Sequence, residues 1–112
     1  MKTIKLIIAT CFAIALSTST FAQSTTKTDT ITVYGQCGMC KTRIEKAAKV
    51  DGVSKAEWND ETDKLTVVYN PSKITLEAIQ KNIAAVGHDT QSVKATDKAY
   101  NALPGCCKYE RK

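Results

Sequence analysis

Two cysteines separated by two residues are the feature of this sequence that is best suited to chemistry. Cys37 and Cys40 lie in segment 35–40, which reads GQCGMC. Two thiols at this spacing can converge on one soft metal ion or close a small disulfide ring, and thiol redox proteins use the same pattern. The motif alone therefore leaves three interpretations open: a metal site, a redox site and a structural disulfide.

Three residues far from this motif could join it. Cys106 and Cys107 are adjacent near the C-terminal end, and His88 follows a glycine. As a neutral imidazole, His88 could be a third metal ligand, or it could tune the charge of the loop. The alternative is a solvated loop histidine without a role in the site. The two late cysteines could complete a three- or four-thiolate site, or form disulfides with the first pair. Adjacent cysteines bond to each other only with strain.

The N-terminal residues 1–22 are predicted to be a signal peptide that is cleaved after Ala22. Lys2 and Lys5 precede an apolar run at 6–16, and Thr20-Phe21-Ala22 gives the small-x-small pattern of a cleavage site before Gln23. The run is about 11 residues, too short to span a bilayer as a helix. Export would place the protein in the periplasm or outside the cell, where disulfides are stable.

The rest of the chain has the size and composition of one small domain. The full sequence has 112 residues, with 16 Lys and Arg against 11 Asp and Glu. This mild positive charge is not organised into a basic patch with interleaved aromatic residues, so we expect no nucleic-acid partner. Membrane contact is expected only through a partner protein.

Hydrophobic periodicity predicts an α+β fold of the ferredoxin-like βαββαβ type. The expected division is a signal peptide at 1–22, a flexible lead-in at 23–29, one domain at 30–95 and a cysteine-containing tail at 96–112. Strands are predicted at 30–34, 53–58, 64–69 and within 89–95, with helices at 40–51 and 75–87 and a short C-terminal helical extension at 96–103.

This topology predicts where the chemistry-bearing residues meet. The cysteine loop, the turn at 59–63 and the connection at 87–89 would lie at the same end of the sandwich. His88 would then face the cysteines. A short helix and a few extended residues cover about 20 Å, comparable to one strand, so the tail could bring Cys106 and Cys107 back to that end.

Several short motifs between residues 30 and 94 occur in the order found in one known family. After the C-x-x-C turn come Ile44-Glu45, Gly52-Val53, Val67-x-Tyr69-x-Pro71, Ile79, Ile83 and Gly87. Together they resemble the heavy-metal-associated domain of copper chaperones, metal-transporting ATPases and periplasmic mercury-binding proteins. The resemblance implies a metal site at Cys37 and Cys40, with Cu(I) favoured and Zn(II) or Hg(II) as alternatives.

The chain departs from that family pattern in two places. The family commonly has a methionine two residues before the first cysteine, where this chain has Gly35 and instead carries Met39 between the cysteines. The tail that contains Cys106 and Cys107 has no counterpart in the basic family domain. We expect Gly35 and Gly38 to let the loop bend around an ion, and the start of the helix at Cys40 to lower thiol pKa values.

These observations predict a periplasmic or secreted heavy-metal binding protein and not an enzyme. It would be a Cu(I) chaperone or scavenger that passes its ion by ligand exchange to a metal transporter or another acceptor, as a monomer or a metal-bridged dimer. The alternatives are a thiol–disulfide redox protein and a disulfide-stabilised interaction module. A thioredoxin-like reading fits poorly, because it requires a larger fold with a cis-proline loop, and the only prolines are Pro71 and Pro104.

Overall fold

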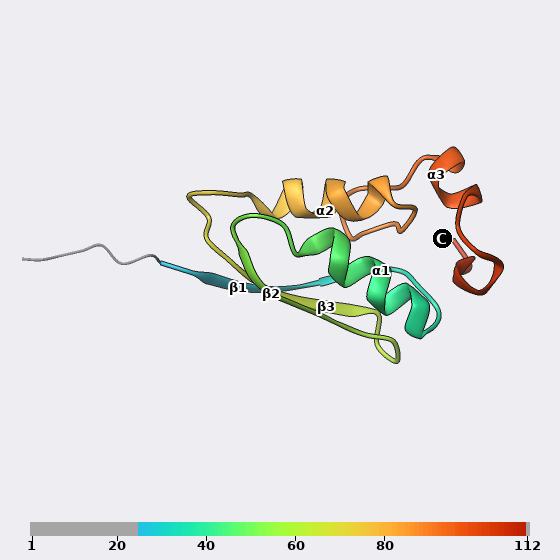
Figure 1. Ribbon diagram of the computed structural model, residues 1–112, viewed down its shortest axis with the longest axis horizontal. Coiled ribbons are helices and arrows are strands. Elements are labelled where there is room, and N and C mark those ends of the chain that lie inside the picture. Colours follow the sequence, from blue (N-terminus) through green and yellow to red (C-terminus); the bar gives the residue numbers. More distant parts are fainter. Residues whose placement is uncertain (1–24, 112) are drawn as a thin grey trace, which may run out of the picture.

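The computed structural model describes residues 25–111, and the expected signal peptide lies outside this range (Figure 1). Within it, three strands form one antiparallel sheet in the order β1-β3-β2. They are β1 (Lys27–Thr32), β2 (Val53–Asn59) and β3 (Lys64–Tyr69). The central strand β3 alternates buried and more exposed side chains, as a strand with one covered face requires.

Two helices cover one face of this sheet, and the core lies between the two layers (Figure 1). Helix α1 (Gly38–Ala48) buries Cys40, Ile44 and Ala48, and α2 (Leu76–Ala85) buries Ile79 and Ile83. The hydroxyl of Thr75 caps α2 by accepting a hydrogen bond from the Ala78 N–H at 3.0 Å. The apolar stripes seen in the sequence therefore face the sheet.

The prediction of a fourth strand within 89–95 is wrong. In the described residues this segment makes a single β-bridge, between Val33 and Thr90. The reason is a tight local turn. The N–H of Thr90 donates to the Val93 carbonyl at 2.7 Å, and its hydroxyl accepts from the Val93 N–H at 3.0 Å. These groups are used inside the segment and cannot extend a ladder with a neighbouring strand.

The first strand and the C-terminal helix also differ from their predicted bounds. β1 begins at Lys27, so residues 27–29 of the expected lead-in belong to the sheet. The C-terminal helical extension is α3 (Asp97–Asn101), shorter than the predicted helix over 96–103. It is followed by a 3₁₀ turn, η1 (Gly105–Cys107), which contacts the helix that carries Cys40.

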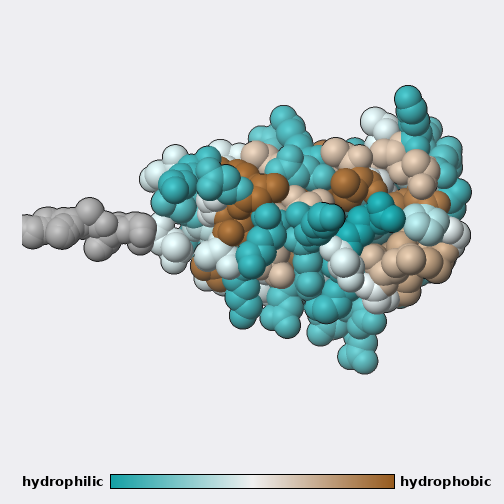
Figure 2. Space-filling model, in the orientation of Figure 1, coloured by the Kyte–Doolittle hydropathy of each residue, from teal (hydrophilic) through white to brown (hydrophobic). Residues whose placement is uncertain are grey.

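The surface of the molecule is polar over much of the face shown in Figure 2, where hydrophobic residues form separate areas among hydrophilic side chains. Across residues 25–111, no helix has the length and apolar character needed to cross a bilayer. Among the described residues, Met39 is the one large hydrophobic residue that is exposed, at 55%. It lies in the cysteine loop.

Candidate metal centre

The first two cysteines lie at the start of α1. Cys37 is the residue before the helix, and Cys40 lies in its first turn, where the Lys41 N–H donates to the Cys37 carbonyl at 3.1 Å. This turn brings the two Sγ atoms to 3.7 Å from each other. Cys40 is fully buried and Cys37 is partly exposed. One thiol is thus fixed inside the domain, and the other is accessible from solvent.

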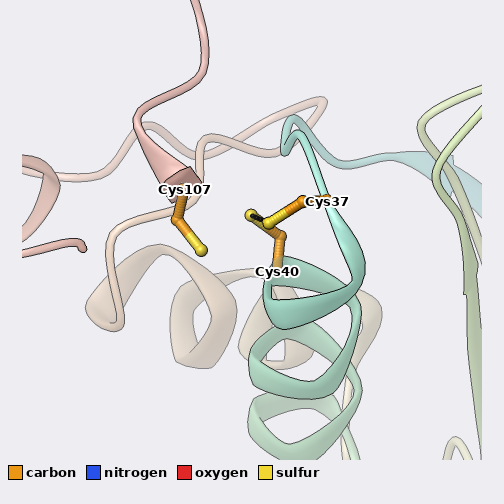
Figure 3. A group of neighbouring side chains, drawn as sticks. All are labelled: Cys37, Cys40 and Cys107. Atoms are coloured by element: carbon orange, nitrogen blue, oxygen red, sulfur yellow. Dashed lines mark hydrogen bonds between the residues drawn. The ribbon is translucent and has the colours of Figure 1, made fainter. Parts of the chain in front are cut away.

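Cys107 brings a third thiol to the same point from the other end of the chain. The Sγ atoms of Cys37, Cys40 and Cys107 all lie within 4.8 Å of one another (Figure 3). Thiolate sulfur binds metals such as zinc at about 2.3 Å, so three sulfurs around one ion stand about 4 Å apart. The spacing therefore suits one thiophilic ion, and all four described cysteines are free thiols.

The local electrostatics favour one thiolate in this group. The backbone N–H of Cys40 is the main cause that lowers the pKa of the Cys37 thiol to about 7, from an ordinary value of 9.0. Burial, followed by hydrogen bonding to Cys40, raises the pKa of Cys107. Near neutral pH a substantial fraction of the molecules therefore carries a thiolate at Cys37 beside a protonated Cys107 thiol.

Cys106 lies outside the three-thiol group. Its Sγ is exposed and lies 3.4 Å from the Sδ of Met39. Its backbone carbonyl, however, accepts hydrogen bonds from Cys37 Sγ at 3.4 Å and from Gln36 Nε2 at 3.1 Å. The structure thus brings Cys107, and not its neighbour, to the first two cysteines, and it joins the tail to the cysteine loop.

His88 is also placed outside the three-thiol group. It is fully buried, and its ring stacks on Tyr109 with a centroid distance of 5.5 Å. Its Nδ1 lies 2.8 Å from the Tyr34 carbonyl, which fixes the ring orientation, while Nε2 has no hydrogen-bond partner. Burial lowers the pKa of His88 and favours the neutral imidazole. The alternative of a solvated loop histidine is therefore wrong.

The space beneath the cysteine loop is filled by Trp58. Its indole Nε1 donates to the Val33 carbonyl at 2.8 Å. A Cβ on Gly35 would stand 2.9 Å from the Trp58 ring and 3.2 Å from the Cβ of Cys40. Gly35 is thus required by close packing, and no side chain such as the family's usual methionine fits here. Trp58 is buried, and the sequence did not indicate that it supports this loop.

Three residues that the sequence analysis did not single out hold the tail in place, and we call Asp89, Tyr109 and Arg111 the tail clasp. The Tyr109 hydroxyl donates to the Gly87 carbonyl at 2.9 Å and accepts from the Asp89 N–H at 2.7 Å. Arg111 binds the Asp89 carboxylate. The sequence carried a signal for this, since Cys107, Tyr109 and Arg111 are two residues apart and their side chains are buried or partly buried, whereas Lys108 and Glu110 are exposed.

Comparison with known proteins gives one consistent match. Residues 30–89 match the heavy-metal-associated domain. The chain is 39% identical over 56 residues to the copper chaperone CopZ of Staphylococcus epidermidis, an alignment that covers 49% of this chain and 82% of that protein. It is 37% identical over 90 residues to a copper-exporting P-type ATPase of Staphylococcus saprophyticus, which covers 68% of this chain and 11% of the ATPase.

A solved structure gives the same result for the fold. The crystal structure of oxidized MerP from Ralstonia metallidurans superposes with a TM-score of 0.56 and 32% identity, over 59% of this chain and 94% of that one. The ferredoxin-like arrangement predicted from the order of the elements is thus confirmed at the level of its structural neighbours. The tail beyond residue 89 lies outside the matched domain.

Proposed function

Because this chain belongs to the heavy-metal-associated domain family, we propose that it binds one soft metal ion through Cys37 and Cys40 and passes it to an acceptor protein. The observation that carries this proposal is the pair of thiols 3.7 Å apart at the start of a helix. The lowered pKa of Cys37 supports it, because the thiolate is the form that binds metal.

Cu(I) is the proposed ion. Soft sulfur ligands favour Cu(I), although they also bind Zn(II) and Hg(II), and in cells geometry and availability decide among them. Two of the matched relatives are named for copper, one a chaperone and one an exporting ATPase. The three-thiol group contains no oxygen or nitrogen donor among its members, which favours a thiophilic cargo.

The difference in exposure between the two thiols suggests from which side an acceptor protein reaches the ion. Binding of each protonated thiol to the ion releases one proton to solvent, and Cys37 already offers a thiolate near neutral pH. An incoming thiolate of an acceptor can reach the ion on the side of the partly exposed Cys37, while the buried Cys40 still holds it. The proposed acceptor is a metal transporter.

The proposed location is the periplasm or the outside of the cell, because residues 1–22 have the pattern of a signal peptide.

A thiol–disulfide redox function is the second candidate, because the same spacing and the same lowered pKa suit a dithiol that reacts with disulfides. Reduction of insulin by the protein would reveal this activity. The family match favours metal binding, and we assign no enzymatic role to Cys37 or Cys40.

Competitive titration tests the proposal. The reduced protein is titrated anaerobically with Cu(I) in the presence of a coloured Cu(I) chelator, and it is expected to take one ion per chain from the chelator. The Cys37→Ser, Cys40→Ser double variant should lose this competition, whereas Cys106→Ser, which removes an exposed thiol outside the group, should retain it. Equal affinity of the double variant and the unaltered protein would refute the site.

A further inference from the structure

We infer that the C-terminal tail supplies a third ligand to this site, so that Cys37, Cys40 and Cys107 hold the ion in a three-sulfur arrangement. The inference rests on the proposed function, which requires only the first two cysteines. It assigns a role to the tail, which lies beyond the matched domain. It also names Tyr109 and Arg111 as positioning residues, since they hold the segment that carries Cys107.

The position of the Cys107 side chain is the first argument. Its Sγ points toward the other two sulfurs from the opposite side, and all three lie within 4.8 Å of one another (Figure 3). Cys107 is fully buried, so its thiol is presented to the group and not to solvent. A buried cysteine can be a small apolar filler. Here, however, it is buried against the two residues that we propose as metal ligands.

The second argument is that the tail is fixed on both sides of Cys107. On the N-terminal side, Leu103 is buried and packs closely on Gly87, where a Cβ would stand 2.8 Å from it. On the C-terminal side, Tyr109 is buried, and its hydroxyl donates to the Gly87 carbonyl at 2.9 Å and accepts from the Asp89 N–H at 2.7 Å. Two anchors four residues or fewer from Cys107 reduce the entropy that the tail would lose on binding the ion.

The third argument is the ionic end of the tail clasp. Arg111 Nε donates to Asp89 Oδ2 at 2.9 Å, and Nη2 donates to Oδ1 at 2.7 Å. Nη2 also donates to the Ala95 carbonyl at 2.7 Å. Asp89 follows the buried His88, so the clasp binds the tail to the connection after α2. Together with the hydrogen bonds that Gln36 and Cys37 donate to the Cys106 carbonyl, the clasp holds the tail against the cysteine loop.

A third thiolate changes what the site does with its ion. Binding by Cys107 releases its proton to solvent and adds one metal–sulfur bond, so an acceptor must displace three ligands instead of two. Cys40 and Cys107 are both buried, which leaves the partly exposed Cys37 as the ligand nearest to solvent. The three-sulfur site should therefore hold its ion longer than a two-cysteine loop, as a scavenger would.

X-ray absorption of the Cu(I)-loaded full-length protein, prepared with one ion per chain, tests the inference. Three sulfurs per copper are expected in the unaltered protein and in Cys106→Ser, and two in Cys107→Ser, with the longer mean Cu–S distance in the first two. Transfer of copper to an excess of a dithiol chelator should be at least severalfold faster from Cys107→Ser. Two sulfurs in the unaltered protein would overturn the inference and leave the proposed function intact. Absence of Cu(I) binding by the unaltered protein would instead contradict the proposed function.

The positioning role of the clasp has its own comparison. Arg111→Ala should give a mixture of two- and three-sulfur copper at a temperature where circular dichroism shows a folded protein. Lys108→Ala is the matched control, because it removes the same charge from an exposed side chain between Cys107 and Tyr109. It should keep three sulfurs. A pure three-sulfur signal in folded Arg111→Ala would show that Arg111 does not position Cys107.

Discussion

Arg111 donates two parallel hydrogen bonds, of 2.9 and 2.7 Å, to the Asp89 carboxylate, in the bidentate geometry that guanidinium and carboxylate groups favour. The Asp89 side chain is only 4% exposed and that of Arg111 22%. The guanidinium also lies over the Tyr100 ring at 4.8 Å. This pair joins the last residues of the described chain to the segment after α2.

Replacement of Arg111 by Ala should destabilise the fold clearly. It leaves the buried Asp89 carboxylate without its charged partner, and removal of one member of a buried pair costs about 3 kcal/mol, somewhat less here because Arg111 is partly exposed. Urea denaturation measures the loss. Lys81→Ala is the control, since its pair with Glu77 at 3.9 Å is exposed and should contribute about 0.5 kcal/mol or less. Equal losses for the two variants would contradict this role.

Stability should fall in acid because of Asp89. Burial alone would raise the pKa of this carboxyl, but hydrogen bonds from Arg111 and the Ala95 N–H hold it below its ordinary value of 3.8. A carboxyl whose pKa is lower in the folded state stabilises the protein above its unfolded pKa and loses that contribution as pH falls through the folded pKa. The free energy of unfolding should therefore drop more steeply below about pH 4 in the unaltered protein than in Asp89→Asn. Parallel pH profiles would refute this assignment.

Two glycines of the cysteine loop should respond differently to alanine. A Cβ on Gly35 would meet Trp58 at 2.9 Å, whereas a Cβ on Gly38 has no heavy atom within 4 Å. Overpacking of a well-filled core costs about 1–3 kcal/mol. Gly35→Ala should lower the midpoint of thermal unfolding, and Gly38→Ala, at the first residue of α1, should leave it unchanged or raise it. Similar midpoints would show that Trp58 does not limit the loop.

The metal-free protein should show a reactive thiol at Cys37. Its pKa of about 7 predicts that the rate of alkylation by iodoacetamide rises with pH to a plateau, with a midpoint two units below that of an ordinary thiol at 9.0. Mass spectrometry of the labelled peptides identifies the residue. Cys107 should remain unlabelled over the same range, because burial raises its pKa. A Cys37 midpoint near 9 would remove this support for metal binding.

Much of the domain could be predicted from the sequence because its elements are strongly patterned. Alternation along 64–69 predicted β3 with the bounds that the structure shows, and the helix predicted at 75–87 is present as α2 (Leu76–Ala85). The prediction of a fourth strand was wrong because Asp89 and Thr90 make hydrogen bonds within a local turn. Hydrophobic periodicity does not register such competition.

The sequence was enough to predict that Cys37 and Cys40 form the candidate site, but it predicted the contribution of Cys107 only in part. The spacing of Cys37 and Cys40 is local, so the start of α1 fixes their geometry. The choice between Cys106 and Cys107 depends on how η1 packs, which a sequence of two adjacent cysteines cannot encode by itself. The same holds for Tyr109 and Arg111, whose partners Gly87 and Asp89 are about 22 residues away.

Metal analysis of the protein purified anaerobically from copper-supplemented cells tests the central claim most directly. Elemental analysis should find about one copper ion per chain in the unaltered protein, since the paired thiolates of Cys37 and Cys40 select a thiophilic ion. The Cys37→Ser, Cys40→Ser variant should contain none. Undiminished copper in that variant, or an unaltered protein that carries no soft metal, would contradict the account.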